Sequence, residues 1–174
     1  MDGFKIAIAT KDGELGDLIS IGKDPVDTDL DTEDSTNENN EKTVIQSVEI
    51  FFDTTDDEVR QKSGSMLAKI EIKGKIVQEN PVLMKKLSKL SEWAHDRRSE
   101  TTYRDICIGV RGSSDSFQVV YVIKNVFVVD YKESYALTDE QDKFELHLTQ
   151  KENNLDKIEI LSNWPSDQKF GRKG

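Results

Sequence analysis

Residues 117–134 read FQVVYVIKNVFVVDYKES, and residues 142–151 read DKFELHLTQK. In the second stretch apolar and polar side chains alternate from Phe144 to Gln150, which predicts a strand with one buried face. The run QVVYVI in the first stretch differs, because its apolar residues occupy both faces. Such a strand is either buried on both sides or has one face against another subunit. We therefore predict a subunit interface at Val119, Val120, Tyr121, Val122 and Ile123.

The sequence on the amino-terminal side of these two stretches is also β-rich. Strands are predicted at residues 4–9, 44–52, 66–73 and 103–111, and Ile19 and Ile21 extend the sheet. Within residues 66–73 every second residue is apolar, namely Met66, Ala68, Ile70 and Ile72. Gly74 follows, and glycine at that position predicts a bulge or a bend.

One helix is predicted over residues 81–95. Asn80 is a favourable N-cap residue, and Pro81 suits the first helical position because its missing N–H has no partner there anyway. Apolar side chains recur at helical spacing, at Leu83, Leu87, Leu90 and Ala94, with Trp93 beside them. One face of the helix should therefore pack on the sheet.

These elements predict one domain over residues 1–174 that is mainly β: an antiparallel sandwich or barrel with one lateral helix. Two segments lack a strand or helix pattern. Residues 23–42 form a flexible acidic loop with eight acids: Asp24, Asp27, Asp29, Asp31, Glu33, Asp34, Glu38 and Glu41. Residues 162–174 form a flexible polar tail with a small basic group at Lys169, Arg172 and Lys173.

The charge of the chain excludes several classes of partner. It has 24 Lys and Arg against 34 Asp and Glu, a formal net charge of −10. An acidic surface disfavours binding to nucleic acids and to anionic membranes, and no apolar run reaches the roughly 20 residues that span a bilayer. The single cysteine, Cys107, cannot form an internal disulfide. Folding in the cytoplasm fits this composition best.

The acidic loop contains a calcium-loop pattern. Asp27, Asp29, Asp31, Ser35 and Glu38 fall at the ligand positions of an EF-hand-like loop. However, Thr32 stands where the sharp turn needs glycine, and the flanking sequence does not predict helices. The pattern favours a solvated acidic loop over a calcium site.

No group of residues predicts catalysis. His95 follows the helix, His147 lies in a strand, and neither has a second ligand at metal-binding spacing. Cys107 lies inside the apolar strand ICIGV, which favours a packing role, and no nucleophile motif is present. We predict a protein that is not an enzyme and that has no cofactor and no metal.

The order of elements from residue 67 onward resembles a known family. It runs LAKIEIKGKIVQENPVLMKKLSKLSEWA, YRDICIGVRG, FQVVYVIKNVFVVDYKES and DKFELHLTQK. This order is similar to the tube fold of the haemolysin-coregulated (Hcp) proteins of type VI secretion and of the tail-tube proteins of contractile phages and phage-like bacteriocins. In particular, a V-x-x-Y-x-x-S run followed by an amphipathic strand resembles the closing strands of that family. The resemblance covers about 90 residues of the carboxy-terminal half.

The resemblance implies a structural subunit of the inner tube of a contractile injection system or phage-like tail. Its copies would form stacked rings, expected to be hexameric, with sheath, baseplate and spike proteins as partners, and the particle would be virion-like or secreted. Contacts between rings would involve the acidic loop, with Asp27, Asp29, Asp31, Asp34 and Glu38. Two alternatives remain: a secreted ring that carries or chaperones effectors, and a small hydrolase or calcium-dependent binding module.

Overall fold

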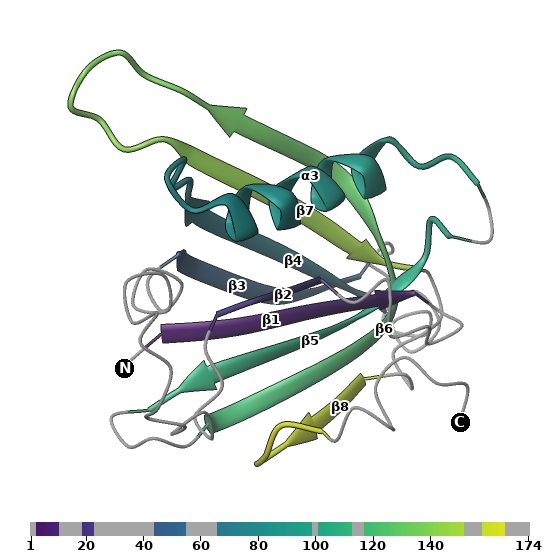
Figure 1. Ribbon diagram of the computed structural model, residues 1–174. Coiled ribbons are helices and arrows are strands. Elements are labelled where there is room, and N and C mark those ends of the chain that lie inside the picture. Colours follow the sequence, from purple (N-terminus) through teal and green to yellow (C-terminus); the bar gives the residue numbers. More distant parts are fainter. Residues whose placement is uncertain are drawn as a thin grey trace.

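The computed structural model describes residues 3–10, 19–22, 44–54, 66–98, 101–112, 117–151 and 158–165 (Figure 1). In chain order its elements are β1 (Gly3–Thr10), β2 (Ile19–Ile21), β3 (Ile45–Thr54), β4 (Met66–Lys75), α3 (Pro81–His95), β5 (Arg104–Arg111), β6 (Phe117–Ser134), β7 (Lys143–Gln150) and β8 (Ile158–Leu161).

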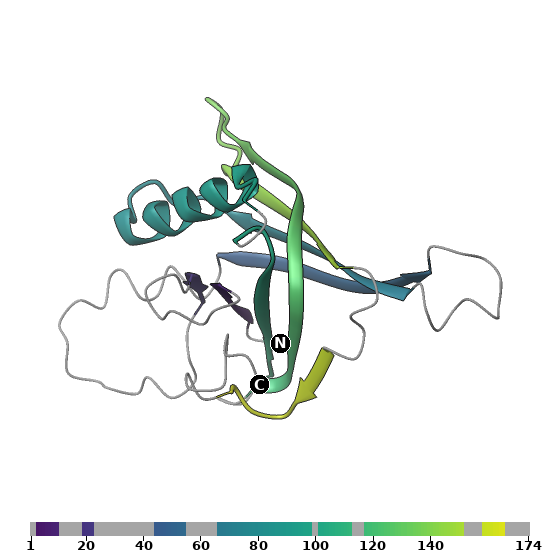
Figure 2. The same ribbon diagram turned by 90° about the vertical axis from the view of Figure 1, so that its right-hand side faces the viewer.

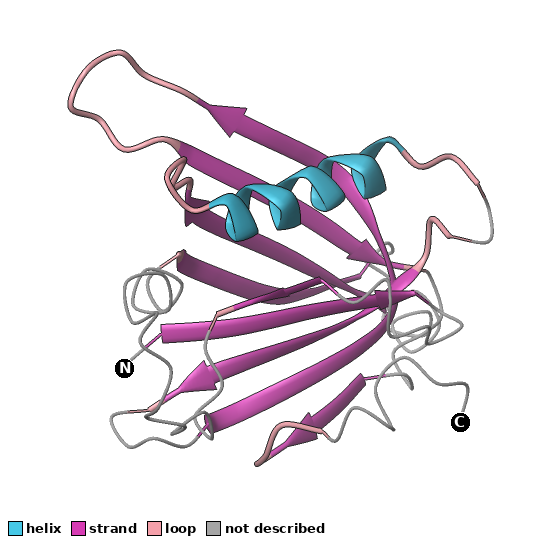
Figure 3. Cartoon of the chain, in the orientation of Figure 1, coloured by secondary structure: helices cyan, strands magenta, loops and turns pink. Residues whose placement is uncertain are grey.

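The strands form one eight-stranded sheet in which every pairing is antiparallel. Seven strands follow the order β2-β1-β5-β6-β7-β4-β3, and β8 pairs with β6 beside them. β1 and β3 approach each other although they lie far apart in this order, so the sheet is curled (Figure 3). The prediction of a mainly β, antiparallel fold is confirmed, and the described residues include the predicted helix. The predicted sandwich or barrel is a half-barrel made from a single curled sheet.

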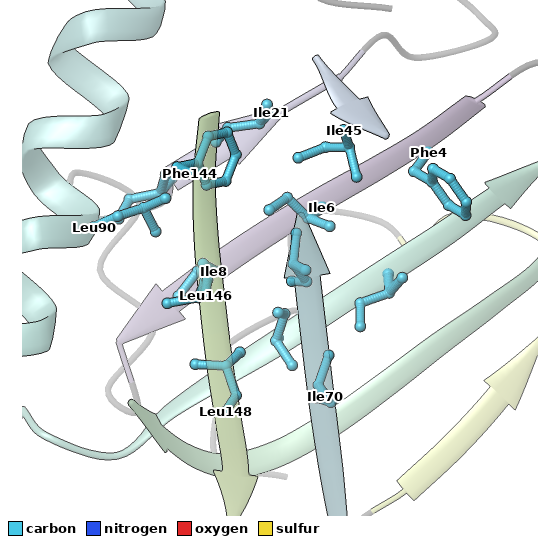
Figure 4. Packing of buried hydrophobic residues seen from close by; sticks show 14 of the residues in the cluster. Phe4, Ile6, Ile8, Ile21, Ile45, Ile70, Leu90, Phe144, Leu146 and Leu148 are labelled. Atoms are coloured by element: carbon cyan, nitrogen blue, oxygen red, sulfur yellow. The ribbon is translucent and has the colours of Figure 1, made fainter. Parts of the chain in front are cut away.

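The main core fills the concave side of this sheet, which we call the inner face (Figure 4). β1, β4, β5 and β7 present alternate aliphatic side chains to it, as the period of two residues in a strand requires. The fully buried side chains include Ile6, Ile8, Ile70, Ile72, Ile106, Ile108, Phe144, Leu146 and Leu148. The alternation predicted at residues 144–150 is therefore confirmed, and that predicted at residues 66–73 is confirmed from residue 68 onward.

The helix α3 closes the inner face from above. The Asn80 side chain accepts a hydrogen bond from the backbone N–H of Leu83 at 3.1 Å, the geometry of an N-cap. Leu83, Leu87 and Leu90 are buried in the main core as predicted. Trp93 completes the apolar stripe with 2% of its surface exposed, whereas Ala94 is only half-buried. The larger side chain reaches the sheet, and its indole N–H donates to the carbonyl oxygen of Thr102 at 2.9 Å.

The strand β6 changes partners near its middle. Its first half pairs with β5 and β8, and its second half pairs with β7. Between the halves, Asn125 has a φ of 58°, a left-handed conformation that is uncommon for a residue with a side chain. The Asp105 carboxylate accepts the Asn125 N–H at 3.1 Å, and β6 has one residue more than β5 at this point. This β-bulge bends the sheet.

Gly74 does not form the predicted bulge. It is paired with Ile45 on one side and Phe144 on the other, and the extra residue belongs to the neighbouring strand, at Gln46. The structure gives another reason for glycine here. A Cβ at position 74 would lie 2.5 Å from Cε1 of Phe144 and 2.7 Å from the carbonyl oxygen of Val44, so the Phe144 ring lies directly on the backbone.

Candidate assembly surfaces

The opposite side of β3, β4, β6 and β7 is polar, and we call it the polar face. Along these strands the residues that alternate with the core are mostly charged: Glu49, Lys69, Glu71, Lys73, Lys75, Asp130, Lys132, Lys143, Glu145 and His147. Figure 2 shows that α3 lies on the other side of these strands. The described helix therefore covers one side of the sheet and leaves this side without a helical layer.

Charges on the polar face are mixed in sign. Across the sheet, Glu49, Glu71, His147 and Asp130 lie opposite one another in one row. His147 lies 3.8 Å from the Glu71 carboxylate and 3.6 Å from that of Glu145. Lysines occupy positions in the rows on both sides, so opposite charges neighbour each other and offset part of the repulsion between acids. The acid excess of the whole chain is not concentrated here.

Among the described residues, the strands at the ends of the main order have one backbone edge that pairs with no other strand. β3 is hydrogen-bonded to β4, and β1 pairs with β2 over three residues, Ile6 to Ile8. At the far end of β3, Phe51 is 40% exposed and Phe52 is 48% exposed. Strand edges with exposed apolar side chains can add a further strand from another chain.

The hairpin between β6 and β7 projects beyond the sheet (Figure 1). Its described side chains from Val129 to Gln141 are mostly exposed, with Tyr135 55% exposed and Leu137 fully exposed. The hydroxyls of Tyr131 and Tyr135 each donate to the Glu133 carboxylate at 2.6 Å. This donation raises the pKa of Tyr135 to about 12. The base of the hairpin is fixed by the Ile76 N–H, which donates to the carbonyl oxygen of Asp142 at 2.8 Å.

The two faces of the run QVVYVI pack against two different apolar clusters of the same chain. Ile123 belongs to the main core, and Val120 and Val122 belong to a second cluster on the convex side of the sheet. Val119 and Tyr121 are half-buried. The carboxy-terminal residues Leu161 and Trp164 pack against the second cluster, so the chain itself supplies a cover. The apolar pattern alone thus no longer requires a partner, and an interface at Val119 to Ile123 stays a prediction.

Sequence reasoning missed two contributors to this region. β8 was not predicted, because KIEIL is short and lies next to polar sequence. Trp164 lies in the segment predicted to be a flexible tail, yet its ring packs against Phe117 with centroids 5.2 Å apart. A tryptophan in a polar stretch was the available signal, since such a large apolar surface usually packs against something.

The remaining predicted candidates do not form a chemical site in the part of the chain that the structure describes. Asp27, Asp29, Asp31, Asp34 and Glu38 lie outside the described residues, so the acidic-loop interpretation and the calcium pattern stay predictions. Among the described residues, His, Cys, Asp and Glu side chains do not gather in threes in a way that could hold a metal ion. Within the same ranges, no helix is both long and apolar enough to cross a membrane.

The surroundings of Cys107 and His95 are those of residues with a structural role. The Cys107 side chain is fully buried, and burial raises the pKa of its thiol to about 12, which leaves very little thiolate near neutral pH. His95 is the last residue of α3, and one ring nitrogen lies 2.7 Å from the carbonyl oxygen of Ser91. These observations agree with a packing role for Cys107 and a helix-end role for His95.

Comparison with known proteins gives matches among solved structures. A chain of the PVC extracellular contractile injection system, in its sheath–tube complex, is 12% identical with a TM-score of 0.46, over 93% of this chain and 90% of that one. A chain of the anti-feeding prophage baseplate is 10% identical with a TM-score of 0.46, over 93% and 94%. Hcp1 from Salmonella typhimurium is 10% identical with a TM-score of 0.45, over 84% and 81%.

These matches fall within the family that the order of elements resembles. No family model matches the sequence, and no curated protein is similar to it.

Proposed function

We propose that this protein is a structural subunit that assembles with copies of itself into stacked rings, forming the inner tube of a contractile injection system or phage-like tail. One observation carries the proposal: a curled sheet has a helix and an apolar core on one side, a polar face on the other, and backbone edges at its ends. Copies joined edge to edge would place their sheets side by side in a closed wall.

The two sides of the sheet suit the two sides of such a wall. The polar face would line the lumen, since its charged side chains are stable in water. The helix would lie outside, where sheath proteins are expected. Because the lysines and acids of the polar face are interleaved, the lumen would be of mixed charge rather than strongly acidic. Six copies per ring, the baseplate and spike as partners, cytoplasmic assembly and a non-catalytic role all belong to this proposal.

The role of the open edge can be tested with Phe52→Lys. A lysine on the edge strand β3 opposes pairing with another chain, because the added charge would be buried there. Phe52 is 48% exposed, so folding should tolerate the change. Val82→Lys on α3 is the matched control, since Val82 is 54% exposed and lies on the helix rather than on an edge strand.

Assembly is measured by sedimentation velocity and negative-stain electron microscopy. We expect Phe52→Lys to reduce the assembled fraction at least tenfold while Val82→Lys assembles like the wild type. Equal assembly of Phe52→Lys and the wild type would rule out the β3 edge as a subunit contact. Isolated rings without tubes in every protein would favour the alternative of a secreted ring-forming carrier.

A further inference from the structure

A short carboxy-terminal segment pairs with β6 as a strand of the sheet and also packs side chains on its convex side. We call residues 158–165 the strap, and they comprise β8 and the described residues that follow it. Under it lies the second cluster, whose members are 0–8% exposed: Ala7, Ala9, Cys107, Phe117, Val120 and Val122. From the strap, Leu161 and Trp164 pack against this cluster, and Ile158 packs against the main core.

Trp164 makes the main side-chain contacts of the strap. Its ring lies 5.2 Å from that of Phe117 at an angle of 30°, and the Lys5 ammonium lies 4.4 Å from the centre of the Trp164 ring. Gly109 forms the floor below both rings. A Cβ at Gly109 would be 2.5 Å from Cε1 of Phe117 and 3.0 Å from Cζ3 of Trp164, so glycine lets the strap lie close to β5.

The backbone holds the strap over a short distance. β8 has four residues and pairs with residues 120–123 of β6. Ile160 is 65% exposed and Glu159 is exposed, so half of the strand contributes little burial. Short segments with few buried contacts open locally at a much lower free energy than the whole domain.

Opening of the strap would expose two features together. One is the second cluster, which is apolar and built partly of small residues such as Ala7 and Ala9. The other is the β6 backbone at residues 120–123, which would become a strand edge. An apolar face beside an unpaired edge is unstable in water and favours association with another chain.

We propose that the strap is a releasable cover over a surface by which a second copy of this chain binds during assembly. This inference depends on the proposed function, because the partner is a second copy. The closed strap protects the surface in the free subunit, and its release allows the second copy to take its place. Of the five residues Val119 to Ile123, the side chains of Val120 and Val122 and the backbone of residues 120–123 then contribute to an interface only after release.

Cys107 reports on the strap directly, because it is the single cysteine and is fully buried in the second cluster. We compare the rate of labelling by a water-soluble thiol reagent in the wild type, in Trp164→Ala and in Ile160→Ala. We expect labelling to be about tenfold faster or more in Trp164→Ala and unchanged in Ile160→Ala, under conditions in which all three are folded by circular dichroism. Equal rates in the wild type and Trp164→Ala would overturn the strap as a cover.

A reversible lock tests whether release matters for association. Val122 and Glu159 lie directly opposite each other in β6 and β8, at a spacing that suits a disulfide. We place cysteines at both positions in a Cys107→Ala background and compare assembly of the same protein oxidised and reduced. We expect the oxidised form to assemble at least tenfold more slowly and the reduced form to recover, with the reduced form confirming that the variant folds.

The two readouts separate this inference from the proposed function. If the oxidised and reduced forms assemble equally, the strap proposal is wrong while tube assembly stands. If no form assembles, including the wild type, the proposed function and with it the second-copy proposal are contradicted, whatever the labelling of Cys107 shows.

Discussion

Single residues set the shape of this sheet at a few positions. Asn125 is one of them, because its left-handed backbone bends β6 between its two sets of partners. The Asp105 carboxylate is 3.1 Å from the Asn125 N–H, and the Gln150 side chain donates to the carbonyl oxygen of Lys124 at 3.1 Å. These contacts fix the bulge from both neighbouring strands.

We expect Asn125→Val to lower the free energy of unfolding by about 1–3 kcal/mol, because a β-branched residue disfavours a positive φ. Asn125→Gly should lower the free energy of unfolding much less, since glycine adopts that conformation readily. Urea denaturation followed by fluorescence measures both changes. If the Asn125→Val and Asn125→Gly proteins were equally stable, the left-handed backbone conformation would not restrict which residue position 125 tolerates.

The Asp96 carboxylate makes the folding stability of the protein depend on pH in the acidic range. The Thr101 hydroxyl donates to its carboxylate and Arg98 lies 3.1 Å away, and these contacts lower the pKa of Asp96 to about 2. A lowered pKa in the folded state stabilises the protein above the unfolded value of about 4, and the contribution is lost as the pH falls towards 2.

Asp96→Asn should therefore be less stable than the wild type at pH 7, and the difference should shrink between pH 4 and pH 2. Denaturation curves of both proteins across this pH range measure it. A stability difference that stays constant down to pH 2 would show that the Asp96 charge is not the stabilising feature.

At the scale of elements, the strongest periodic patterns predicted the structure well. The alternation in β4 and β7 and the helical spacing in α3 gave their buried faces, because each pattern reflects one face in water and one in the core. The pattern placed Ala94 in the buried stripe with Trp93 beside it, whereas Trp93 is the more deeply buried, because spacing does not report how far a side chain reaches.

Other elements could not be predicted because their signals are not local. β8 depends on pairing with β6 from about 40 residues earlier, and a four-residue strand has too little sequence to show a period. The bulge opposite Gly74 lies on β3, and glycine is required at position 74 because the Phe144 ring, 70 residues away, occupies the place of a Cβ. Contacts of this kind appear only when the sheet is assembled.

The contact between β4 and β7 can be tested at Gly74. We expect Gly74→Ala to lower the free energy of unfolding by about 1–3 kcal/mol, because its methyl group would meet the Phe144 ring and the Val44 carbonyl oxygen. Gly112→Ala is the control, since its Cβ would meet only the Gln118 Cβ, at 3.9 Å. Chemical denaturation of both variants measures the difference, and equal stability would contradict the tight packing at Gly74.

At the scale of the whole molecule, the sequence predicted the class of fold and a candidate interface but not how that interface is covered. The doubly apolar run of β6 pointed to a buried second face, and the structure supplies part of the cover from the chain's own strap. Charge patterning predicted an acidic protein, whereas the polar face is mixed in sign among the described residues. Net charge says nothing about where the charges lie.

The central claim, self-assembly into a tube, is tested most directly by electron microscopy of the purified wild-type protein over a range of concentrations. The account predicts rings that stack into hollow tubes, with the curled sheets joined edge to edge and the polar face towards the lumen. A protein that remains monomeric at every concentration, with or without the Trp164→Ala change that frees the strap, would contradict it.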